Sequence, residues 1–389
     1  MRILCVFGAH QYGDATRGAS LEASCFIPAL REEGHEVSLF DSWIRGRYAT
    51  LAELNGALLD AVVALRPDLL LSVVRDVELW SETLGAIRAR GVRTLSWATD
   101  DTWKWRQVSR FILHDYDGMI TTHEGALEDY RQHGARHVLL SQWAAPTAAF
   151  QAPLPAASCR HQVSFVGIAY GDRRRFVAAL VEAGIPVTCF GHQWPAGSVP
   201  ADDIPRIMRD SVIALNFSKG LYGGPHQIKA RVFEVPGAGG FLLTEDAPGL
   251  SRWFRIGEEI DVFHDEASLV ERVRHYLAQP VLRDQCARRA HERTRREHTY
   301  RQRMRAVVAF AQSLPAPHAG PVDLAPAMAH HVRSWWLRAL RQLLVGACRA
   351  LWGKRRSQAY ARRIAFELSW RLSGRRSFCA AGWFGRMFP

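Results

Sequence analysis

At 389 residues the chain is long enough for two domains with sizeable cores, and its hydrophobic content of 48% is typical of globular proteins. Its net charge of +12 is unevenly spread: residues 318–389 carry +11, whereas residues 1–317 hold 37 basic and 36 acidic side chains. This balance argues against a body that binds nucleic acid. The seven cysteines are odd in number and lack CxxC spacing, which argues against a disulfide framework or a zinc site and favours a reducing compartment.

The first residues, MRILCVFGAH, lack the long apolar core of a signal peptide and predict a first strand instead. No stretch approaches about 18 uncharged apolar residues, so we expect no transmembrane helix. Together these features predict a cytoplasmic protein.

Residues 1–150 alternate apolar, strand-like runs with segments of helical periodicity, which predicts a parallel sheet with helices on both faces. The strands are expected in RILCVFG, EVSLF, DLLLSVV, RTLSWA, DGMITT and HVLLS. Helices are expected at 17–33, 50–65 and 78–90. This region is interpreted as an N-terminal Rossmann-like domain.

Residues 144–160 are rich in Ala and Pro and show no periodicity, which predicts a domain linker. A second α/β series at 158–314 predicts a C-terminal Rossmann-like domain. Its expected helices are at 173–183, 204–209, 266–278 and 281–314. The cleft between two such domains is the usual place for a ligand.

A second linker is expected at 315–326, followed by a basic tail at 327–389 that holds five of the 13 tryptophans. Trp336, Leu340 and Leu351 recur at helical spacing among arginines, which predicts a basic amphipathic helix. Such a helix suits an anionic membrane surface, here through residues 328–376, on the inner face of the cell membrane. One alternative is a helix that packs on the body with its charges solvated. The other alternative is that the tail binds nucleic acid or another partner. We do not expect nucleic acid to be the partner.

The stretch at 211–245, SVIALNFSKGLYGGPHQIKARVFEVPGAGGFLLTE, joins two apolar runs through a Gly-rich basic loop and a short helical segment. In a doubly wound sheet, the loop after such a strand opens at the ligand crevice. Further pieces are QVSFVG and TLSWATDD upstream, and GEE and HTY with Arg303 downstream. In this order, the pieces resemble the CgeB-type (spore maturation protein-like) glycosyltransferases with a glycosyltransferase group 1 C-terminal domain. The resemblance covers about residues 1–312 and leaves the tail outside.

This resemblance implies an α/β protein of the GT-B fold, with two Rossmann-like doubly wound domains facing a cleft and the last helix crossing back to the first domain. The tail is then an addition to this fold. The implied activity is that of a hexosyltransferase-like enzyme of class EC 2.4. It would move a sugar from a nucleotide-sugar donor in the second domain to an envelope, lipid-linked or protein acceptor against the first. The fold usually needs no metal, and we expect no cofactor.

Four charged residues are the main candidates for the donor site. Lys229 and Arg231 suit the diphosphate, because charge-assisted bonds to phosphate favour an ammonium or a forked guanidinium. Glu234 matches the acidic residue that accepts hydrogen bonds from ribose hydroxyls in related GT-B enzymes. Arg173 lies at a loop-to-helix junction, where an anion can be held. The alternative for each is an ordinary solvated surface side chain.

Four smaller residues complete the candidate donor site. Asn216 and Ser218 end an apolar run and could bond the nucleotide, or they could cap a loop. Gly239 and Gly240 would allow the donor to approach the backbone closely, although they also stop a helix.

His226 departs from the pattern of related retaining enzymes, which often carry a second glutamate eight residues before the one matched by Glu234. This departure leaves the sugar contact and the stereochemistry of transfer open.

The loops GAHQYGDATRG and ATDDTW follow strands of the first domain and should face the cleft. Transfer with inversion needs a general base for the acceptor hydroxyl, and Asp100, His10 and His123 are the candidates. Adjacent aspartates before a helix also suit N-capping, which we expect of Asp101.

Two classes of function remain open. One is a nucleotide-sugar glycosyltransferase; the other is a non-catalytic GT-B-like scaffold that docks a partner or a membrane through its basic tail. A dinucleotide oxidoreductase is disfavoured, because GAHQYG replaces the GxGxxG pattern after the first strand.

Overall fold

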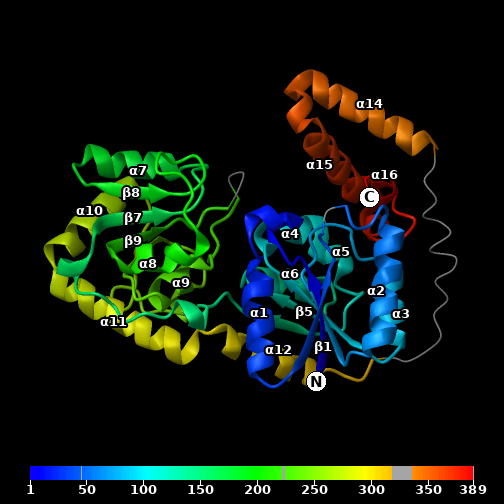
Figure 1. Ribbon diagram of the computed structural model, residues 1–389, viewed down its shortest axis with the longest axis horizontal. Helices are drawn as coiled ribbons and strands as arrows, with labels where there is room; N and C mark the ends of the chain where they lie inside the picture. Colours follow the sequence, from blue (N-terminus) through cyan, green and yellow to red (C-terminus); the bar gives the residue numbers. More distant parts are fainter. Residues whose placement is uncertain (45, 221–223, 318–334, 389) are drawn as a thin grey trace. The chain divides into compact units, whose positions relative to one another are not determined.

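The computed structural model describes residues 1–44, 46–220, 224–317 and 335–388. The chain forms two compact units, each described here by itself (Figure 1). The first unit comprises Met1–Thr121, Ala126–Leu140 and Arg305–Pro389, and the second comprises Thr122–Gly125 and Ser141–Met304. The predicted tail is therefore part of the first unit and not a separate domain.

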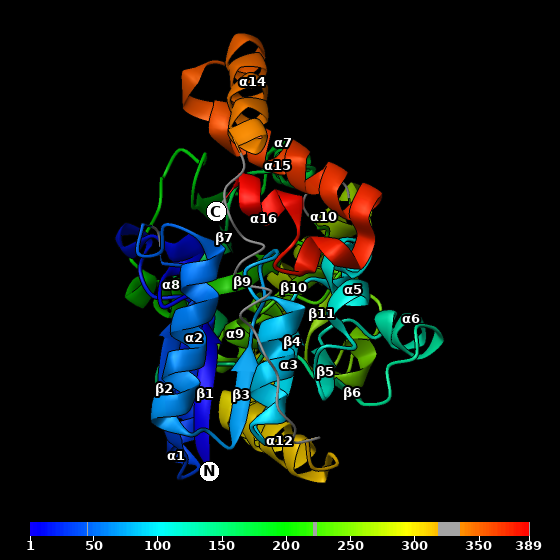
Figure 2. The same ribbon diagram turned by 90° about the vertical axis from the view of Figure 1, so that its right-hand side faces the viewer.

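The first unit contains a six-stranded parallel sheet in the order β2-β1-β3-β4-β5-β6. The sheet lies between helices on both faces, and the apolar runs of β1, β3, β4 and β5 are accordingly buried almost throughout (Figure 2). The strands are β1 Arg2–Phe7, β2 Glu36–Asp41, β3 Leu69–Ser72, β4 Arg93–Ala98, β5 Gly118–Thr121 and β6 Val138–Leu140.

Side chains cap the first two helices of the first unit. The Ser20 hydroxyl accepts the Ala23 N–H at 3.0 Å, so the helix predicted from residue 17 begins only at Leu21. Thr50 caps the second helix in the same way. The helices are α1 Leu21–Glu32, α2 Leu51–Leu65, α3 Ser81–Ala89, α4 Asp101–Lys104, a π-helical turn Trp105–Ser109, α5 Arg110–Ile112 and α6 Ala126–Gln132.

The second unit has a five-stranded parallel sheet in the order β11-β10-β9-β7-β8. Two parallel-sheet Rossmann-like units follow one another along the chain, as the alternating patterns predict. The strands are β7 His161–Val166, β8 Val187–Phe190, β9 Ser211–Asn216, β10 Leu242–Glu245 and β11 Asp261–Phe263. The helices are α7 Arg173–Glu182, α8 Ile204–Arg209, α9 Arg231–Gly237, α10 Glu266–Ala278 and α11 Pro280–Glu297.

The long helix predicted at 281–314 is in fact two helices, because His298 and Thr299 interrupt it. The α11 helix ends at Glu297, and α12 (Tyr300–Ser313) begins beyond a capping box. In this box the Thr299 hydroxyl accepts the Gln302 N–H at 3.2 Å, and the Gln302 amide oxygen accepts the Thr299 N–H at 2.8 Å.

The HTY motif with Arg303 fixes this turn. The His298 ring donates from Nε2 to the Trp253 carbonyl at 2.9 Å, and Arg303 donates to its Nδ1 at 3.2 Å. Burial, helped by Arg303, lowers the pKa of His298 to about 4, so the ring is neutral at pH 7. The Arg303 guanidinium also lies over the Trp253 ring at 4.8 Å. The motif therefore has a structural role: it fixes the turn between α11 and α12.

The described part of the tail forms α14 (Trp335–Trp352), α15 (Lys354–Ser373) and α16 (Trp383–Met387). The predicted linker beyond residue 317 and the start of the tail up to residue 334 lie outside the described residues. No described helix is long and apolar enough to cross a membrane.

The tail helices share the hydrophobic core of the first unit. Leu337, Phe366 and Phe384 are buried there, and Arg362 pairs with Asp76 at 3.1 Å. The alternative that the tail packs on the body thus holds for the side of the tail helices that carries these buried residues.

Candidate functional site

The polar residues of the second unit gather at one edge of its sheet. Strands β7, β9 and β10 are parallel neighbours, so the loops that follow them meet at the carboxyl edge. Arg173 follows β7, Ser218 and Lys219 follow β9, and Glu245 ends β10. This edge brings together several of the predicted donor residues and three that were not predicted.

Arg173 is held firmly in place beside β7. Its guanidinium donates to the Ile168 carbonyl at 2.9 Å and to the Tyr170 hydroxyl at 2.8 Å, and it stacks 3.9 Å from the centre of the Tyr170 ring. Burial lowers the pKa of Arg173, and the Arg231 cation adds to this effect, whereas Tyr170 and Glu245 oppose it. Arg173 and Arg231 therefore lie within each other's electrostatic field.

Arg231 and Glu234 form an ion pair on the first turn of α9, with side chains only 23% and 20% exposed. Arg231 donates to Oε2 of Glu234, and Lys229 lies half-buried two residues earlier. Arg231 is thus paired with Glu234, while Arg173 lies within its electrostatic field, and a dianionic group would stabilise two such cations.

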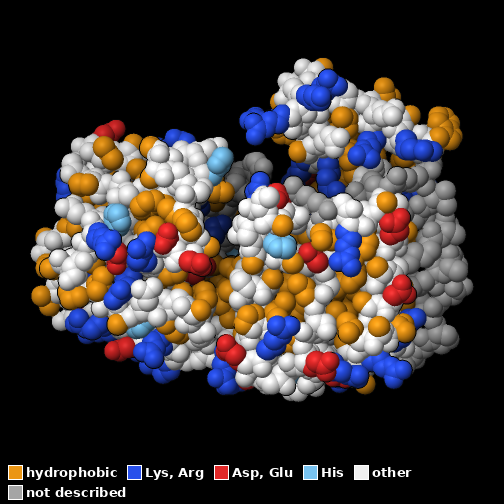
Figure 3. Space-filling model, viewed as in Figure 1, with side chains coloured by type: hydrophobic (Ala, Val, Ile, Leu, Met, Phe, Trp, Pro, Cys, Tyr) orange, Lys and Arg blue, Asp and Glu red, His pale blue; other side chains and the backbone are white. Residues whose placement is uncertain are grey.

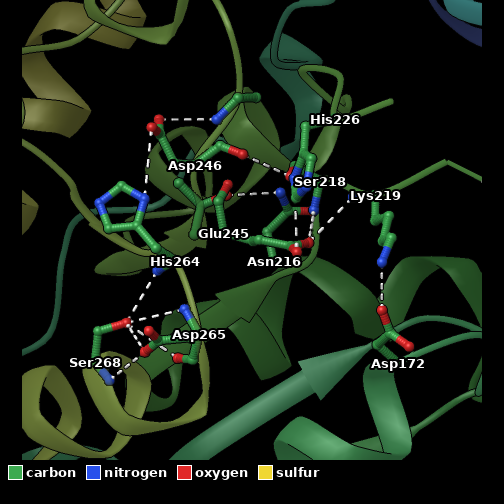
Figure 4. A network of polar contacts seen from close by, with 12 residues as sticks. Asp172, Asn216, Ser218, Lys219, His226, Glu245, Asp246, His264, Asp265 and Ser268 are labelled. Carbon is green, nitrogen blue, oxygen red and sulfur yellow. Dashed lines mark hydrogen bonds and ion pairs between the residues drawn. The ribbon is translucent and has the colours of Figure 1, made fainter. Parts of the chain in front are cut away.

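Glu245 organises the loop after β9. Its Oε2 accepts the backbone N–H groups of Ser218 at 2.9 Å and Lys219 at 3.1 Å, although the carboxylate is almost fully buried. Figure 4 shows Ser218 and His226 turned toward Glu245, while the Lys219 ammonium reaches Asp172 at 2.5 Å. Lys219 holds the pKa of Asp172 below its ordinary value.

The hydrogen bonds of Ser218 fix the tautomer of His226. The Ser218 hydroxyl has one proton, which it donates to the Asp246 carbonyl at 2.7 Å. The contact of 2.7 Å with Nδ1 of His226 must then be donated by the imidazole. Nε2 of a neutral His226 is therefore an acceptor, on a side chain that is 42% exposed. Glu245 lies 3.6 Å from Nδ1 and favours this orientation.

Two of the smaller candidate residues are bound to the protein itself. Asn216 donates a hydrogen bond to the Thr244 hydroxyl at 2.9 Å, which joins β9 to β10. The Ser218 hydroxyl forms hydrogen bonds with the Asp246 carbonyl and the His226 ring. The structure therefore favours the loop-capping interpretation for Asn216 and Ser218.

The prediction for Gly239 and Gly240 needs correction. Both precede β10 and lie at the amino-terminal edge of the sheet, away from Arg173 and Glu245. A Cβ atom on Gly239 would come within 2.5 Å of the Gln151 carbonyl oxygen, and one on Gly240 within 2.5 Å of the Met208 carbonyl oxygen. These glycines allow close approach of the protein's own backbone, not of a donor.

The candidate bases of the first sheet are not brought together as a pair. His10 follows β1, Asp100 follows β4 and His123 follows β5, all at the carboxyl edge, and each is half-buried. Strand β3 separates β1 from β4, so the ends of these two strands lie about 10 Å apart. Asp100 begins α4 without a side-chain cap.

Asp101 is not the N-cap that its position predicted. It is almost fully buried and accepts hydrogen bonds from the hydroxyls of Ser109 at 2.5 Å, Thr121 at 2.6 Å and Tyr130 at 3.0 Å. Asp101 therefore ties α4 to the π-helical turn, to β5 and to α6.

Sequence reasoning missed Glu245, Lys219 and Asp172. The acidic pair that follows the apolar run FLLT was a usable signal for Glu245, since a charged residue at a strand's carboxyl end tends to face the ligand edge. Within the described ranges, no group of three or more His, Cys, Asp or Glu side chains could hold a metal ion.

Comparison with known proteins agrees with this architecture. Residues 173–309 match a family model described as Glycosyl transferase-like. No curated protein sequence matches the chain.

Solved structures with similar folds include a sucrose-phosphate synthase from Thermosynechococcus elongatus, with a TM-score of 0.55 and 11% identity over 80% of this chain and 98% of that one. Alr3699/HepE from Anabaena, in complex with UDP and glucose, has a TM-score of 0.57 and 13% identity over 81% of this chain and 100% of that one. A glycosyltransferase from Rickettsia africae gives a TM-score of 0.54 and 9% identity over 80% and 97% of the two chains. The chain therefore has the two-domain GT-B fold, and its second unit is similar in sequence to glycosyltransferases.

Proposed function

We propose that the protein is a glycosyltransferase that binds a nucleotide-sugar donor at the carboxyl edge of the second sheet. The observation that carries this proposal is that Arg231, paired with Glu234, lies within the electrostatic field of the half-buried Arg173, inside the region that matches the Glycosyl transferase-like family. The subfamily suggested by the sequence, the CgeB type, is part of the same proposal.

Each charged group has a chemical role in this proposal. Arg173 and Arg231 bind the diphosphate, with Lys229 next to them, because paired guanidiniums give charge-assisted bonds to phosphate oxygens. Arg231 occupies only one oxygen of Glu234, so the other oxygen can accept bonds from the ribose hydroxyls. Nε2 of His226 accepts a hydrogen bond from the transferred sugar. Asp100, His10 and His123 remain the candidate bases for the acceptor hydroxyl, and no metal takes part.

UDP is the first ligand to test, since the Alr3699/HepE structure was obtained in complex with it. The assay is a thermal shift with UDP, followed by release of sugar from UDP-glucose. Replacing Arg173 by Gln should weaken UDP binding about 10-fold, because a charged hydrogen bond contributes roughly 1.5–3 kcal/mol. Glu234→Ala should weaken it similarly.

Arg175→Gln is the matched control, because this arginine lies on the same helix and pairs with Glu266 on α10. Equal UDP binding in all three variants and the parent would contradict the donor site. UDP binding without hydrolysis or transfer over a broad acceptor panel would favour the scaffold alternative, which the His226 departure keeps open.

The outer face of α14 is the basis of the membrane component of the proposal. Trp335 and Leu343 are 76% and 71% exposed on this helix. Between residues 335 and 366 the chain has eight Lys or Arg and no Asp or Glu. Figure 3 shows basic and apolar side chains interspersed over the region of α14 and the start of α15, at the upper right. Acidic phospholipid complements both properties, so the tail holds the enzyme peripherally on an anionic membrane, near an envelope or lipid-linked acceptor.

Sedimentation with vesicles of phosphatidylcholine and phosphatidylglycerol tests this attachment. Leu343→Ser should weaken binding about 10-fold, because burying a leucine contributes roughly 1.5–3 kcal/mol. Val281→Ser, at an equally exposed site (68%) on α11, is the control and should bind as the parent does. A parent protein that stays in the supernatant would refute the membrane attachment.

A further inference from the structure

The tail closes a cavity on the first unit. The cavity measures about 540 Å³. On one side are the loops that follow β2 and β3; on the other are α14, α15 and the residue after α16. In α/β folds ligands bind beyond the carboxyl ends of the strands, and pockets for small ligands span roughly 300–1,000 Å³. Place and volume both suit a small ligand.

The two acids of this cavity are already satisfied by the protein. Asp76 pairs with Arg362 of α15 at 3.1 Å. Burial alone would raise the pKa of Asp76, but Arg362 and Arg75, helped by Lys104, hold it below the ordinary value. Glu78 accepts the Asp76 N–H at 2.7 Å and the indole N–H of Trp43 at 3.2 Å. The hydrogen bonds hold Glu78 in place but leave its charge, so the three arginines that line the cavity, Arg75, Arg341 and Arg362, outnumber its two acids.

Among the described residues, two arginines of the cavity form no direct ion pair with a carboxylate, although Arg75 is close enough to Asp76 to lower its pKa. The Arg75 guanidinium lies over the Trp43 ring at 5.7 Å, and that of Arg341, on α14, lies over the Phe388 ring at 5.2 Å. Tyr48 also lines the cavity. The cavity thus combines excess positive charge with aromatic surfaces, on which the CH face of a sugar can pack.

We propose that this cavity binds a phosphorylated sugar, and that α14 to α16 complete the acceptor site of the enzyme. Arg75 and Arg341 bind the phosphate, and Trp43 and Tyr48 contact the sugar ring. The assignment as acceptor rests on the proposed function. The phosphate belongs either to a free sugar phosphate or to the head group of a sugar lipid; the second source suits a helix whose outer face lies on a membrane.

Calorimetric titration of the full chain with glucose 6-phosphate, glucose and inorganic phosphate tests the site. Glucose 6-phosphate should bind more tightly than either fragment. Arg341→Gln and Arg75→Gln should each weaken it about 10-fold, the effect of one charge-assisted bond. Arg338→Gln, on the same helix but not lining the cavity, should leave binding unchanged. No binding, or equal binding by all these variants, would overturn the proposal.

Vesicles distinguish the two sources of phosphate. If a lipid head group enters the cavity, Arg341→Gln will weaken binding to phosphatidylcholine vesicles that contain phosphatidylinositol more than to those that contain phosphatidylglycerol. An equal effect on both vesicle types, with glucose 6-phosphate binding lost, assigns the site to a free sugar phosphate.

UDP titration of the same variants separates this proposal from the proposed function. Normal UDP binding without arginine-dependent sugar-phosphate binding refutes the cavity site alone. The reverse result refutes the donor site and leaves the cavity site standing.

Discussion

Replacing Asp101 by asparagine should destabilise the first unit, whereas replacing its neighbour Asp100 should not. Asp101 is buried and accepts three hydroxyl hydrogen bonds, from Ser109, Thr121 and Tyr130. Asparagine has nearly the same shape but one acceptor oxygen and no charge. The substitution therefore removes hydrogen bonds without leaving a cavity.

The magnitude follows from this count of bonds. A hydrogen bond to a charged group contributes roughly 1.5–3 kcal/mol, and a neutral one roughly 0.5–1.5 kcal/mol. Losing the charge at three bonds, with one or two of them re-formed as neutral bonds, should cost about 2–4 kcal/mol. In a unit of this size, that corresponds to a fall in Tm of roughly 5–15 °C.

Hydrogen exchange of β5 and α6, read by mass spectrometry, reports the stability of this region directly. The Asp101→Asn variant should exchange faster there and melt earlier. The Asp100→Asn variant should melt within about 0.5 kcal/mol of the parent. If Asp100 is the base, this variant should lose at least about 100-fold in transfer rate. An unchanged melting curve for Asp101→Asn would refute the assignment of Asp101 as a structural acid.

Three further predictions concern other parts of the fold. His298 has a folded pKa of about 4, below its ordinary value, so between these two values the unfolded chain binds more protons than the folded one. The free energy of unfolding should therefore fall by about 2 kcal/mol as the pH drops from 7 to 5. Urea unfolding of His298→Gln should show a flatter pH dependence. Gly239→Ala should lower the Tm of the second unit, because Gly239 has a φ of +87° and faces the Gln151 carbonyl. The variant protein that folds should bind UDP as tightly as the parent does. A loss of UDP affinity would show that the glycine belongs to the donor site. Phe384→Ala should cost about 3–5 kcal/mol in urea unfolding of the first unit, because the ring is fully buried, and no change would mean that the tail does not pack there.

Regular elements were predictable because their signals are local. Apolar runs marked the strands of both sheets, and periodicity marked α2 and α10 to within a few residues. The break at His298 and Thr299 was missed although its capping box, Thr-x-x-Gln, is visible in the sequence. The break was missed because the segments before and after the box both have a helical pattern, so the two helices resemble a single long one.

The site was less predictable because it depends on contacts between distant residues. Lys229, Arg231 and Glu234 could be grouped by their spacing, but Glu245 joins them only through the pairing of β9 with β10. Gly239 and Gly240 were misjudged for the same reason, because their nearest neighbours are backbone atoms of residues distant in the sequence. Helix packing decides which of the tail's arginines contact Asp76, Asp115, Glu367 or the cavity, and composition does not encode that packing.

The shared core of the first unit has a consequence for how the protein is made. Its strands come from the first 140 residues, yet its core includes Phe366, Phe384 and Phe388. During synthesis, part of the apolar surface of the N-terminal sheet therefore stays uncovered until the second unit and the tail helices have left the ribosome. The second unit, whose segments are nearly continuous, can fold first. We expect nascent chains stalled before residue 366 to need chaperones, and a fusion placed after residue 388 to disturb the first unit more than one placed before residue 1.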